Sequence, residues 1–475
     1  MSLPIASVVE PLAASELSTA YRDALLYLFS TARYDGRGQK YLHPERSQAR
    51  MREILERLGN PQQRFQAIHI TGTKGKGSTS AYAESILRHL GYRTGLFTSP
   101  HLHTFRERVR IDGQLMTKEE LPALIERLRP HFEEIPDLSV FDKITALAFQ
   151  HFADAGVDWA VVEVGLGGRL DSTNVLMPRV CGITRISKDH MHVLGDTLAE
   201  IAYEKAGIIK PGVPVFVSPQ RSEPHRVLAE TAAARHAPIH WVAPLRTPPA
   251  PLFGRHQQIN AAVAWRMIED LAQRGELPHY DEDKAAAGLA ATWWPGRFEL
   301  LPDAGTTPLL VDCAHNVDSI NILCTILRQK YRNRPVTFIF GANRDKRMRP
   351  MVEHLLDVSP RLVLVQSRHA KALSTQEILR EIQPWLAKHD PRASVILEAA
   401  SMTEAVTVAT SITPPDGLLV GTGSVFVTAE LREAWNVLHP NAFPPTDWVH
   451  QAAGEPDLNV PMQAGAQAKA RRQTP

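Results

Sequence analysis

The stretch HITGTKGKGSTS, residues 69–80, places glycines, lysines and hydroxyl residues in one short loop. The apolar run FQAIHI (65–70) before it is typical of a buried strand, and from Ser78 onward the apolar residues have the spacing of a helix. The glycines therefore fall at a strand-to-helix turn. Backbone N–H groups and the helix N-terminus at such a turn favour phosphate oxygens, so the stretch predicts a phosphate-binding loop.

Each residue of this loop has a chemical use in that prediction. Lys76 can reach the terminal phosphates of a nucleotide, and the Ser78 hydroxyl can ligate Mg²⁺. The common spacing G-x-x-x-x-G-K-[ST] is not met, because the loop has the shorter G-x-x-G-K-G-S. A glycine-rich turn with a lysine by chance is the alternative. The backbone could approach a ligand closely at Gly72, Gly75 and Gly77.

Outward from the loop, short β-branched runs alternate with amphipathic helical segments, which is the pattern of a parallel sheet with crossover helices. A second such series follows WWPGRFEL (293–300). We therefore expect an α/β fold with an N-terminal P-loop ATPase-like domain over residues 1–297 and a C-terminal Rossmann-like α/β domain over 298–440. Residues 441–475 are rich in Pro, Ala and Gln and are predicted to form a disordered tail.

Length and composition limit the class of protein. A chain of 475 residues exceeds what one core usually serves, so two domains are expected. The net charge of +2 and the 7% of aromatic residues argue against nucleic acid as a partner. The 3 cysteines form no Cys-x-x-Cys pair, which argues against a disulfide framework or a zinc site. With no basic leader and no run long enough to span a membrane, we expect a cytoplasmic protein.

A second motif is DWAVVEVGLGGRLDSTN, residues 158–174. Glu163 interrupts an apolar strand near its C-terminal end, where open α/β sheets bind their ligands. A buried carboxylate needs a cation, so a metal role beside Ser78 is reasonable; a solvated edge-strand glutamate is the alternative. The GLGG segment has the wrong spacing for a dinucleotide fingerprint.

A third motif is KDHMHVLGDTLAEIAYEKAGIIKPG, residues 188–212. Thr197 and Glu200 predict a capping box, and Gly207 predicts the helix end, which places Lys205 in the last turn. The helix dipole alone would explain a lysine there. His190, near the expected helix start, is either a metal ligand or structural.

Together the motifs resemble the folylpolyglutamate synthase family, which includes bacterial dihydrofolate synthases, within the Mur ligase superfamily. The resemblance covers roughly residues 45–435 and is carried, in order, by TGTKGKGST, FTSPHLHTFRERVRIDGQ, FDKITALAF, VEVGLGGRLDSTN, KDHMHVLG, IAYEKAGIIKPG, GRHQQINAAVA, WPGRFE, VDCAHN and GTGSVFVTAELR. It implies ATP-dependent amide ligation, in which a carboxylate takes the γ-phosphoryl group and the amine of L-glutamate then displaces phosphate. The implied acceptor is dihydropteroate or folate, and a monomer is expected.

The resemblance also implies residue roles. Lys76 and the amides of the loop, from Gly72 and Thr73 through Gly75 and Gly77, would hold the ATP phosphates. Two Mg²⁺ sites are implied, with Ser78 and Glu163 at one, His190 at the other and Lys205 as a carbamate ligand; a monovalent cation is a further possibility. The other implied contacts are Asn260 with adenine, Arg297, Asp312 and His315 with the nucleotide, Ser99, Pro100, His101, Arg106 and Arg108 with the pterin, and Ser424 near glutamate.

Several positions depart from the family pattern. Lys74 stands where asparagine is usual, and Cys313 and Val317 replace a glycine and a proline. Asp142 and Lys143 replace a glutamate and a neutral residue, which makes the pterin acceptor less certain. A plain N-cap is the alternative role of Asn260.

Three functional hypotheses follow. The first is a bifunctional dihydrofolate and folylpolyglutamate synthase, with a single-activity member of the family as its variant. The second is a peptidoglycan-precursor ligase, disfavoured because those enzymes carry a nucleotide-sugar domain ahead of the loop and only about 68 residues precede it here. The third is a non-catalytic nucleotide-binding protein, against which the candidates for every catalytic role argue.

Overall fold

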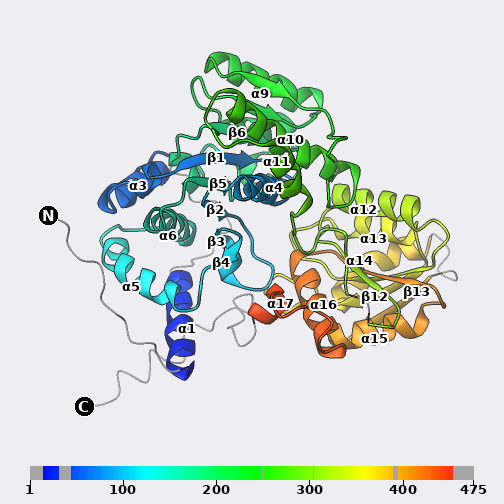
Figure 1. The fold of residues 1–475 in the computed structure, drawn as a ribbon. Coiled ribbons are helices and arrows are strands. Elements are labelled where there is room, and N and C mark those ends of the chain that lie inside the picture. Colours follow the sequence, from blue (N-terminus) through cyan, green and yellow to red (C-terminus); the bar gives the residue numbers. More distant parts are fainter. Residues whose placement is uncertain (1–13, 31–43, 249, 303, 389–393, 453–475) are drawn as a thin grey trace, which may run out of the picture. The chain divides into compact units, whose positions relative to one another are not determined.

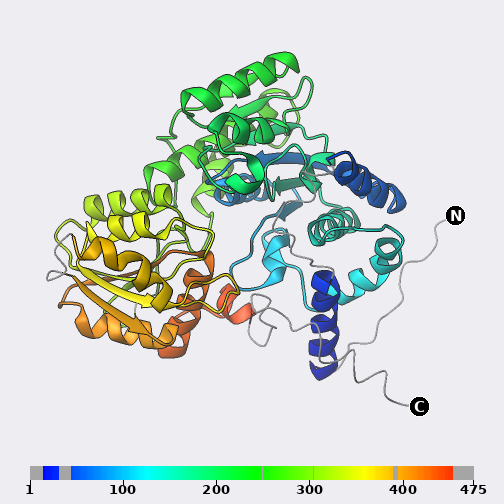
Figure 2. The same ribbon diagram turned by 180° about the vertical axis from the view of Figure 1, so that it is seen from behind.

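The computed structural model describes residues 14–30, 44–248, 250–302, 304–388 and 394–452, which form two compact units (Figures 1 and 2). The first unit comprises Met1–His101, Phe105–Pro251 and Arg255–Trp293. The second comprises Leu102–Thr104, Leu252–Gly254 and Trp294–Pro475. The boundary between the large parts thus falls four residues before the expected 297/298, and two short segments of the N-terminal half belong to the second unit.

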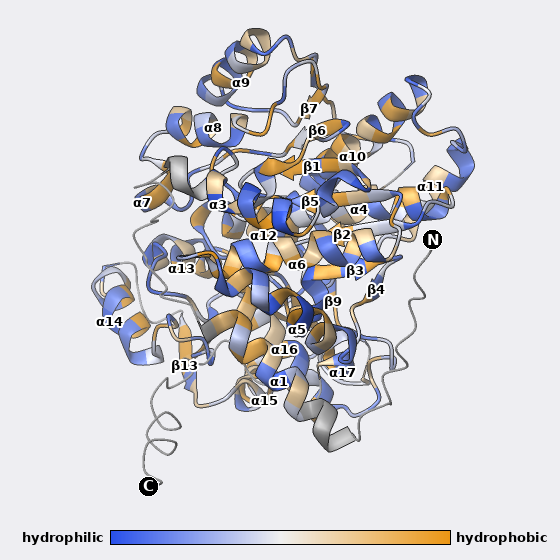
Figure 3. Ribbon diagram, turned by 90° about the vertical axis from the view of Figure 1, so that its left-hand side faces the viewer, coloured by the Kyte–Doolittle hydropathy of each residue, from blue (hydrophilic) through white to orange (hydrophobic). Residues whose placement is uncertain are grey.

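The first unit is built on a mostly parallel sheet in the order β4-β3-β2-β5-β1-β6-β7-β8. Its strands are β1 (Gln66–Thr71), β2 (Thr94–Phe97), β3 (Val109–Ile111), β4 (Gln114–Leu115), β5 (Trp159–Glu163), β6 (Val180–Ile183), β7 (Val215–Val217) and β8 (Ile239–Trp241). Only the β2–β3 and β3–β4 pairs are antiparallel. The central strands are apolar and are buried on both faces, as parallel strands must be when helices cover both sides (Figure 3).

The helices of this unit are α1 (Ala14–Ser30), α3 (Pro44–Arg57), α4 (Lys76–His89), α5 (Glu120–Glu133), α6 (Val140–Asp154), α7 (Met191–Leu194), α8 (Leu198–Ala206), α9 (Ser222–Ala234), α10 (Arg255–Gln273) and α11 (Glu282–Ala290), with 3₁₀ turns η1 (Pro61–Gln63), η2 (Phe105–Arg108) and η3 (Ser172–Val175). Successive side chains of a strand point to opposite faces of the sheet, so neighbouring residues of one strand pack against different helices. Gly182 of β6 leaves room for Met267 of α10, whereas its neighbours Cys181 and Ile183 join the core under α8 and α9.

The second unit contains a sheet in the order β13-β12-β11-β14-β10-β9, with only β9 antiparallel. Its strands are β9 (Glu299–Leu300), β10 (Leu309–Val311), β11 (Val336–Phe340), β12 (Arg361–Val365), β13 (Val395–Ala399) and β14 (Leu418–Thr422), and its helices are α12 (Val317–Lys330), α13 (Met348–Leu356), α14 (Thr375–Leu386), α15 (Met402–Ile412), α16 (Val425–Leu438) and α17 (Trp448–Gln451).

This second sheet separates two cores. Leu310, Phe338 and Leu362 point to the core shared with α12, α13 and α14, and their neighbours Ile339 and Val363 point to the core shared with α15 and α16. Two apolar faces on one sheet explain why these strands are continuous apolar runs in the sequence. The expected α/β fold class, with a parallel-dominated sheet in each half, is confirmed.

The expected disordered tail needs correction at its start. Residues 441–452 are folded and include α17, whose N-cap Asp447 accepts a hydrogen bond from the backbone of Val449 and one from the buried Arg432. Residues 453–475 lie outside the described residues. Among the described residues, no helix combines the length and the apolar composition needed to cross a bilayer.

Candidate active site

The glycine-rich loop joins β1 to α4, as the sequence predicted, but α4 begins at Lys76 rather than at Ser78. Gly72 and Gly75 have φ values of 149° and 94° and mark the turn. The first residues of a helix have no intrahelical partner for their N–H groups, so those of Lys76, Gly77 and Ser78 point out of the helix end. This end of α4 therefore offers donors to an anion.

Neighbouring residues fix the loop from both sides. The amides of Thr73 and Lys74 both donate to the carbonyl of Arg185, at 3.0 and 3.2 Å. A Cβ at Gly75 would lie 2.3 Å from Oδ1 of Asn260, so that side chain fills the place next to the glycine. Thr73 therefore shapes the loop through its amide rather than offering that amide to phosphate.

Replacing Gly75 with alanine is expected to raise the KM for ATP about tenfold and to lower the free energy of unfolding by about 1–3 kcal/mol. Both the positive φ and the clash with Asn260 contribute. Gly91→Ala is the matched control, because Gly91 has a φ of 93° and no atom within 4 Å of its would-be Cβ. Steady-state kinetics and thermal unfolding of the two variants separate the steric clash with Asn260 from the strain of a positive φ. Equal effects of the two substitutions would show that contact with Asn260 adds nothing.

Glu163 is the carboxylate at the centre of the site. It ends β5 beside Ile70 of β1, and it is only 3% exposed. Its Oε1 lies 3.6 Å from Nζ of Lys76, and its Oε2 accepts the amide of Ser99 at 3.0 Å. The alternative of a solvated edge-strand glutamate does not hold, because β5 is a central strand and the side chain is buried.

Lys205 lies in the last turn of α8, behind the same loop. The predicted capping box of Thr197 and Glu200 is present. Lys205 is buried, and its Nζ donates to the carbonyl of Gly72 at 2.9 Å. Burial, with the nearby Lys76 cation, lowers the pKa of Lys205 to about 7. A large share of this amine is therefore neutral near neutral pH.

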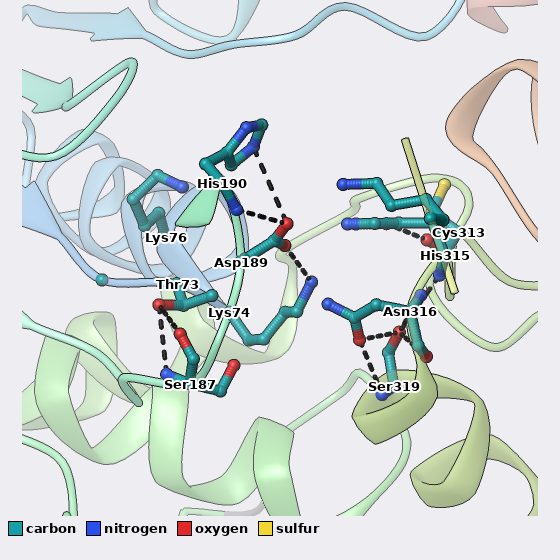
Figure 4. Close-up of polar contacts among 12 residues, drawn as sticks. Thr73, Lys74, Lys76, Ser187, Asp189, His190, Cys313, His315, Asn316 and Ser319 are labelled. Atoms are coloured by element: carbon teal, nitrogen blue, oxygen red, sulfur yellow. Dashed lines mark hydrogen bonds and ion pairs between the residues drawn. The ribbon is translucent and has the colours of Figure 1, made fainter. Parts of the chain in front are cut away.

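His190 and Lys74 share Asp189 as a partner (Figure 4). Nζ of Lys74 lies 3.0 Å from Oδ2 of Asp189, whose side chain is 9% exposed. The amide of His190 donates to Oδ1 of Asp189 at 3.0 Å, and the His190 ring is half-exposed. The extra charge of Lys74 is thus largely balanced by Asp189, a residue that the sequence analysis did not assign.

Asn260 lies inside α10, one turn beyond its start at Arg255, which removes the N-cap alternative. Its Nδ2 donates to Oε1 of Gln257 at 3.0 Å, and Nε2 of Gln257 donates to the Ser78 hydroxyl at 3.4 Å. Gln257 was missed, although its three-residue spacing from Asn260 on a helix would have placed the two side chains on one face. Through Asn260 and Gln257, α10 therefore reaches both Gly75 and the hydroxyl of Ser78.

Residues 99–108, here called the acceptor loop, leave the end of β2 next to Glu163. Ser99–Pro100 is a cis peptide bond. Nε of Arg108 donates to Nδ1 of His101 at 2.9 Å, whereas Arg106 is buried and donates to the carbonyl of Met116 at 3.1 Å. Of the predicted pterin contacts, Arg106 is therefore engaged with the backbone that follows β4.

The predicted residues of the second unit gather where β10 and β14 end. Asp312 is partly buried and accepts the amides of Phe298 and Ala314 at 2.8 and 2.9 Å; desolvation raises its pKa, against the effect of the nearby Arg297. His315 donates from Nδ1 to the carbonyl of Cys313 at 2.9 Å (Figure 4). Ser424 is the buried N-cap of α16.

The residues around the loop fit a magnesium ion chemically. Mg²⁺ prefers oxygen ligands, and the Ser78 hydroxyl and the buried Glu163 carboxylate supply them at the loop. Within the described part of the chain, no group of three or more His, Cys, Asp and Glu side chains could hold a metal by itself. A site here would therefore draw on the hydroxyl and on phosphate oxygens.

Comparison with known proteins agrees with this geometry. Residues 70–240 match the Mur ligase middle domain, and residues 296–425 match the Mur ligase, glutamate ligase domain. The dihydrofolate synthase/folylpolyglutamate synthase of Bacillus subtilis is 34% identical over 367 residues, which cover 71% of this chain and 83% of that protein.

Solved structures give the same result. The folylpolyglutamate synthase of Mycobacterium tuberculosis, complexed with ADP and AMPPCP, has a TM-score of 0.74 at 31% identity and covers 83% of this chain and 95% of its own. A complex of a folylpolyglutamate synthase (FPGS) with AMPPCP and folate has a TM-score of 0.71 at 30% identity. The match covers 87% of this chain and 98% of that structure's chain.

The two matched Mur ligase domains define an ATP-dependent ligase of the Mur type. The chain belongs to the folylpolyglutamate synthase/dihydrofolate synthase family of that superfamily.

Proposed function

We propose that this ligase adds L-glutamate to dihydropteroate and to reduced folates, as a bifunctional dihydrofolate and folylpolyglutamate synthase. The acceptor carboxylate takes the γ-phosphoryl group of ATP, and the amine of glutamate then attacks the acyl phosphate and releases phosphate. The relatives named for both activities, and the FPGS complex with AMPPCP and folate, support this choice of substrates.

One observation carries the proposal. Glu163 touches both the phosphate loop, through Lys76, and the first residue of the acceptor loop, through the amide of Ser99. Phosphoryl transfer to a carboxylate requires ATP and acceptor to meet within bond-forming distance. A single buried carboxylate that contacts both loops places them side by side at the end of β5.

Phosphoryl transfer depends mainly on positioning and on charge. Lys76 and the N–H groups at the start of α4 would hold the β- and γ-phosphates, with Asn260 near the adenine. A magnesium ion held by Ser78 and Glu163 would neutralise charge on the phosphates and on the acceptor carboxylate. Lys205, as a carbamate, would supply a further anionic ligand in the family pattern.

Three residues of the second unit would contact the nucleotide. Asp312 accepts the amide of Phe298, the residue after Arg297, and His315 donates from Nδ1 to the carbonyl of Cys313. These three residues match the family positions that contact the nucleotide. Ser424 is already the cap of α16, so we propose that its backbone, rather than its hydroxyl, lies near glutamate.

The departures at Asp142 and Lys143 do not argue against a pterin acceptor. Asp142 forms the capping box of α6 and accepts a hydrogen bond from Ser172 at 2.6 Å. Lys143 is buried with its Nζ 4.8 Å from the ring centroid of Tyr27. Both residues thus act in the packing of the first unit.

Purified protein with ATP, Mg²⁺ and radiolabelled glutamate, offered dihydropteroate and tetrahydrofolate separately, tests the proposal. Label in the product of both reactions is expected. Label with only one acceptor would reduce the proposal to a single-activity enzyme. No ATP-dependent incorporation with either acceptor would overturn it.

A further inference from the structure

The middle of the acceptor loop belongs to a different unit from its two ends. Ser99–His101 and the segment from Phe105 onward are part of the first unit, whereas Leu102–Thr104, here called the strap, are part of the second. The chain therefore leaves the first unit and returns to it within the loop that is expected to bind the acceptor. Whatever holds the strap also sets the path of this loop.

Both ends of the loop are fixed in the first unit. The amide of Thr98 donates to the carbonyl of Arg108 at 3.0 Å, and the amide of Ser99 donates to Glu163. Phe105 is buried and packs edge-on against Phe29 of α1, with ring centroids 6.1 Å apart. Only the strap remains to be placed by other contacts.

His103 holds the strap in the second unit. Its imidazole is fully buried, with Nε2 2.8 Å from NH1 of Arg432 and Nδ1 3.2 Å from Oε1 of Glu433. Because arginine can only donate, Nε2 must be the acceptor, and Nδ1–H must donate to the carboxylate. His103 is thus a neutral ring with a defined tautomer and both nitrogens engaged.

Arg432 is itself fixed before it reaches the strap. It is completely buried and donates to Oε1 of Glu299 at 3.1 and 3.2 Å and to Oδ2 of Asp447 at 2.7 Å. Its guanidinium lies 4.8 Å from the ring centroid of Phe443. Two carboxylates already balance its charge, so a neutral acceptor such as His103 suits the remaining donor. This position therefore favours a side chain that accepts from Arg432 and donates to Glu433.

We propose that His103 is a positioning residue for the acceptor: held between Arg432 and Glu433, it fixes the acceptor loop in the orientation that receives the pterin substrate. This inference rests on the proposed function. His103 then affects acceptor binding without contacting the substrate. Arg432 and Glu433 of α16, and Asp447 at the N-cap of α17, contribute indirectly because they hold His103 or Arg432 in place.

The test compares His103→Ala with His103→Gln in the full-length enzyme. His103→Ala is expected to raise the KM for the pterin acceptor about tenfold while the KM for ATP stays within about twofold, since the loss of a buried hydrogen-bond partner acts on the loop alone. His103→Gln keeps an acceptor for Arg432 and a donor for Glu433, so it is expected to recover most of the acceptor affinity. If His103→Ala fails to fold, Glu433→Ala takes its place: it removes the acceptor of Nδ1–H at a partly exposed carboxylate, so a rise in the KM for the acceptor is expected there too.

Trp435→Phe is the matched control. It removes the hydrogen bond from Nε1 to the carbonyl of Pro302, 3.1 Å, in the same buried helix, without touching the strap. A similar loss of thermal stability with an unchanged acceptor KM is expected. Equal rises in acceptor KM for Trp435→Phe and His103→Ala, or no rise for folded His103→Ala and Glu433→Ala, would overturn the inference. Wild-type enzyme without any glutamate incorporation would instead overturn the proposed function.

Discussion

Replacing Lys76 with alanine is expected to lower kcat about a hundred- to a thousandfold, the usual effect of removing one group that stabilises transition-state charge. The lysine is needed most when negative charge develops on the moving phosphoryl group. Its side chain is 17% exposed and lies 3.6 Å from Glu163, so the ammonium is held at the loop before any ligand binds.

The fold should survive this change, because alanine at the first position of α4 favours helix formation. Lys74→Asn is the matched control, since Lys74 stands two residues away but faces Asp189. We expect it to change the KM for ATP modestly and to leave kcat similar. Steady-state kinetics with thermal unfolding distinguish the two variants. A kcat near normal in Lys76→Ala would remove this lysine from the chemistry.

Replacing Lys205 with alanine is expected to abolish most of the activity, with partial recovery on addition of acetate or formate. CO₂ adds only to a neutral amine, and burial together with Lys76 brings the pKa of Lys205 to about 7, so the reactive form is available. Addition turns a repelled cation into an anion that suits Lys76 and a magnesium ion. A small carboxylate could occupy the place of that anion in the alanine variant.

Lys210→Ala is the matched control for this prediction. Burial also lowers the pKa of Lys210, to about 8, but its Nζ donates to the carbonyl of Asn174 at 2.8 Å. Lys210 therefore has a lowered pKa like that of Lys205, but it does not contact the glycine-rich loop. We expect no recovery of activity by acetate or formate in Lys210→Ala. A ¹³C NMR signal from labelled bicarbonate should be lost in Lys205→Ala and kept in Lys210→Ala. High activity of Lys205→Ala without added carboxylate would contradict the carbamate.

The parts of the fold that could be predicted are those with strong local patterns. The central strands and the capping box of α8 follow from apolar runs and from the spacing of Thr197 and Glu200. The hairpin of β3 and β4 and the edge strands β8, β9 and β13 were not predicted, because short or exposed strands carry little apolar signal. The tail was misjudged since composition does not show that Asp447 meets a buried arginine.

The residues of the candidate site likewise include some that the sequence indicated and some that it did not. Lys76, Ser78 and Glu163 come from motifs next to strand ends, and topology brings strand ends together. Gln257, Asp189 and the use of the Thr73 amide by Arg185 depend on pairing between segments more than a hundred residues apart. Within one segment, the spacing of Gln257 from Asn260 was the one available signal.

The strap also means that the second unit is not a continuous stretch of the gene. A fragment that begins at Trp294 would encode every strand of its sheet, yet it would lack the imidazole that accepts a hydrogen bond from Arg432. During synthesis Leu102–Thr104 leave the ribosome long before Arg432 is made. Their contacts with the second unit can therefore form only after most of the first unit has been synthesised. The second unit is therefore completed only after Arg432, in α16, has been made.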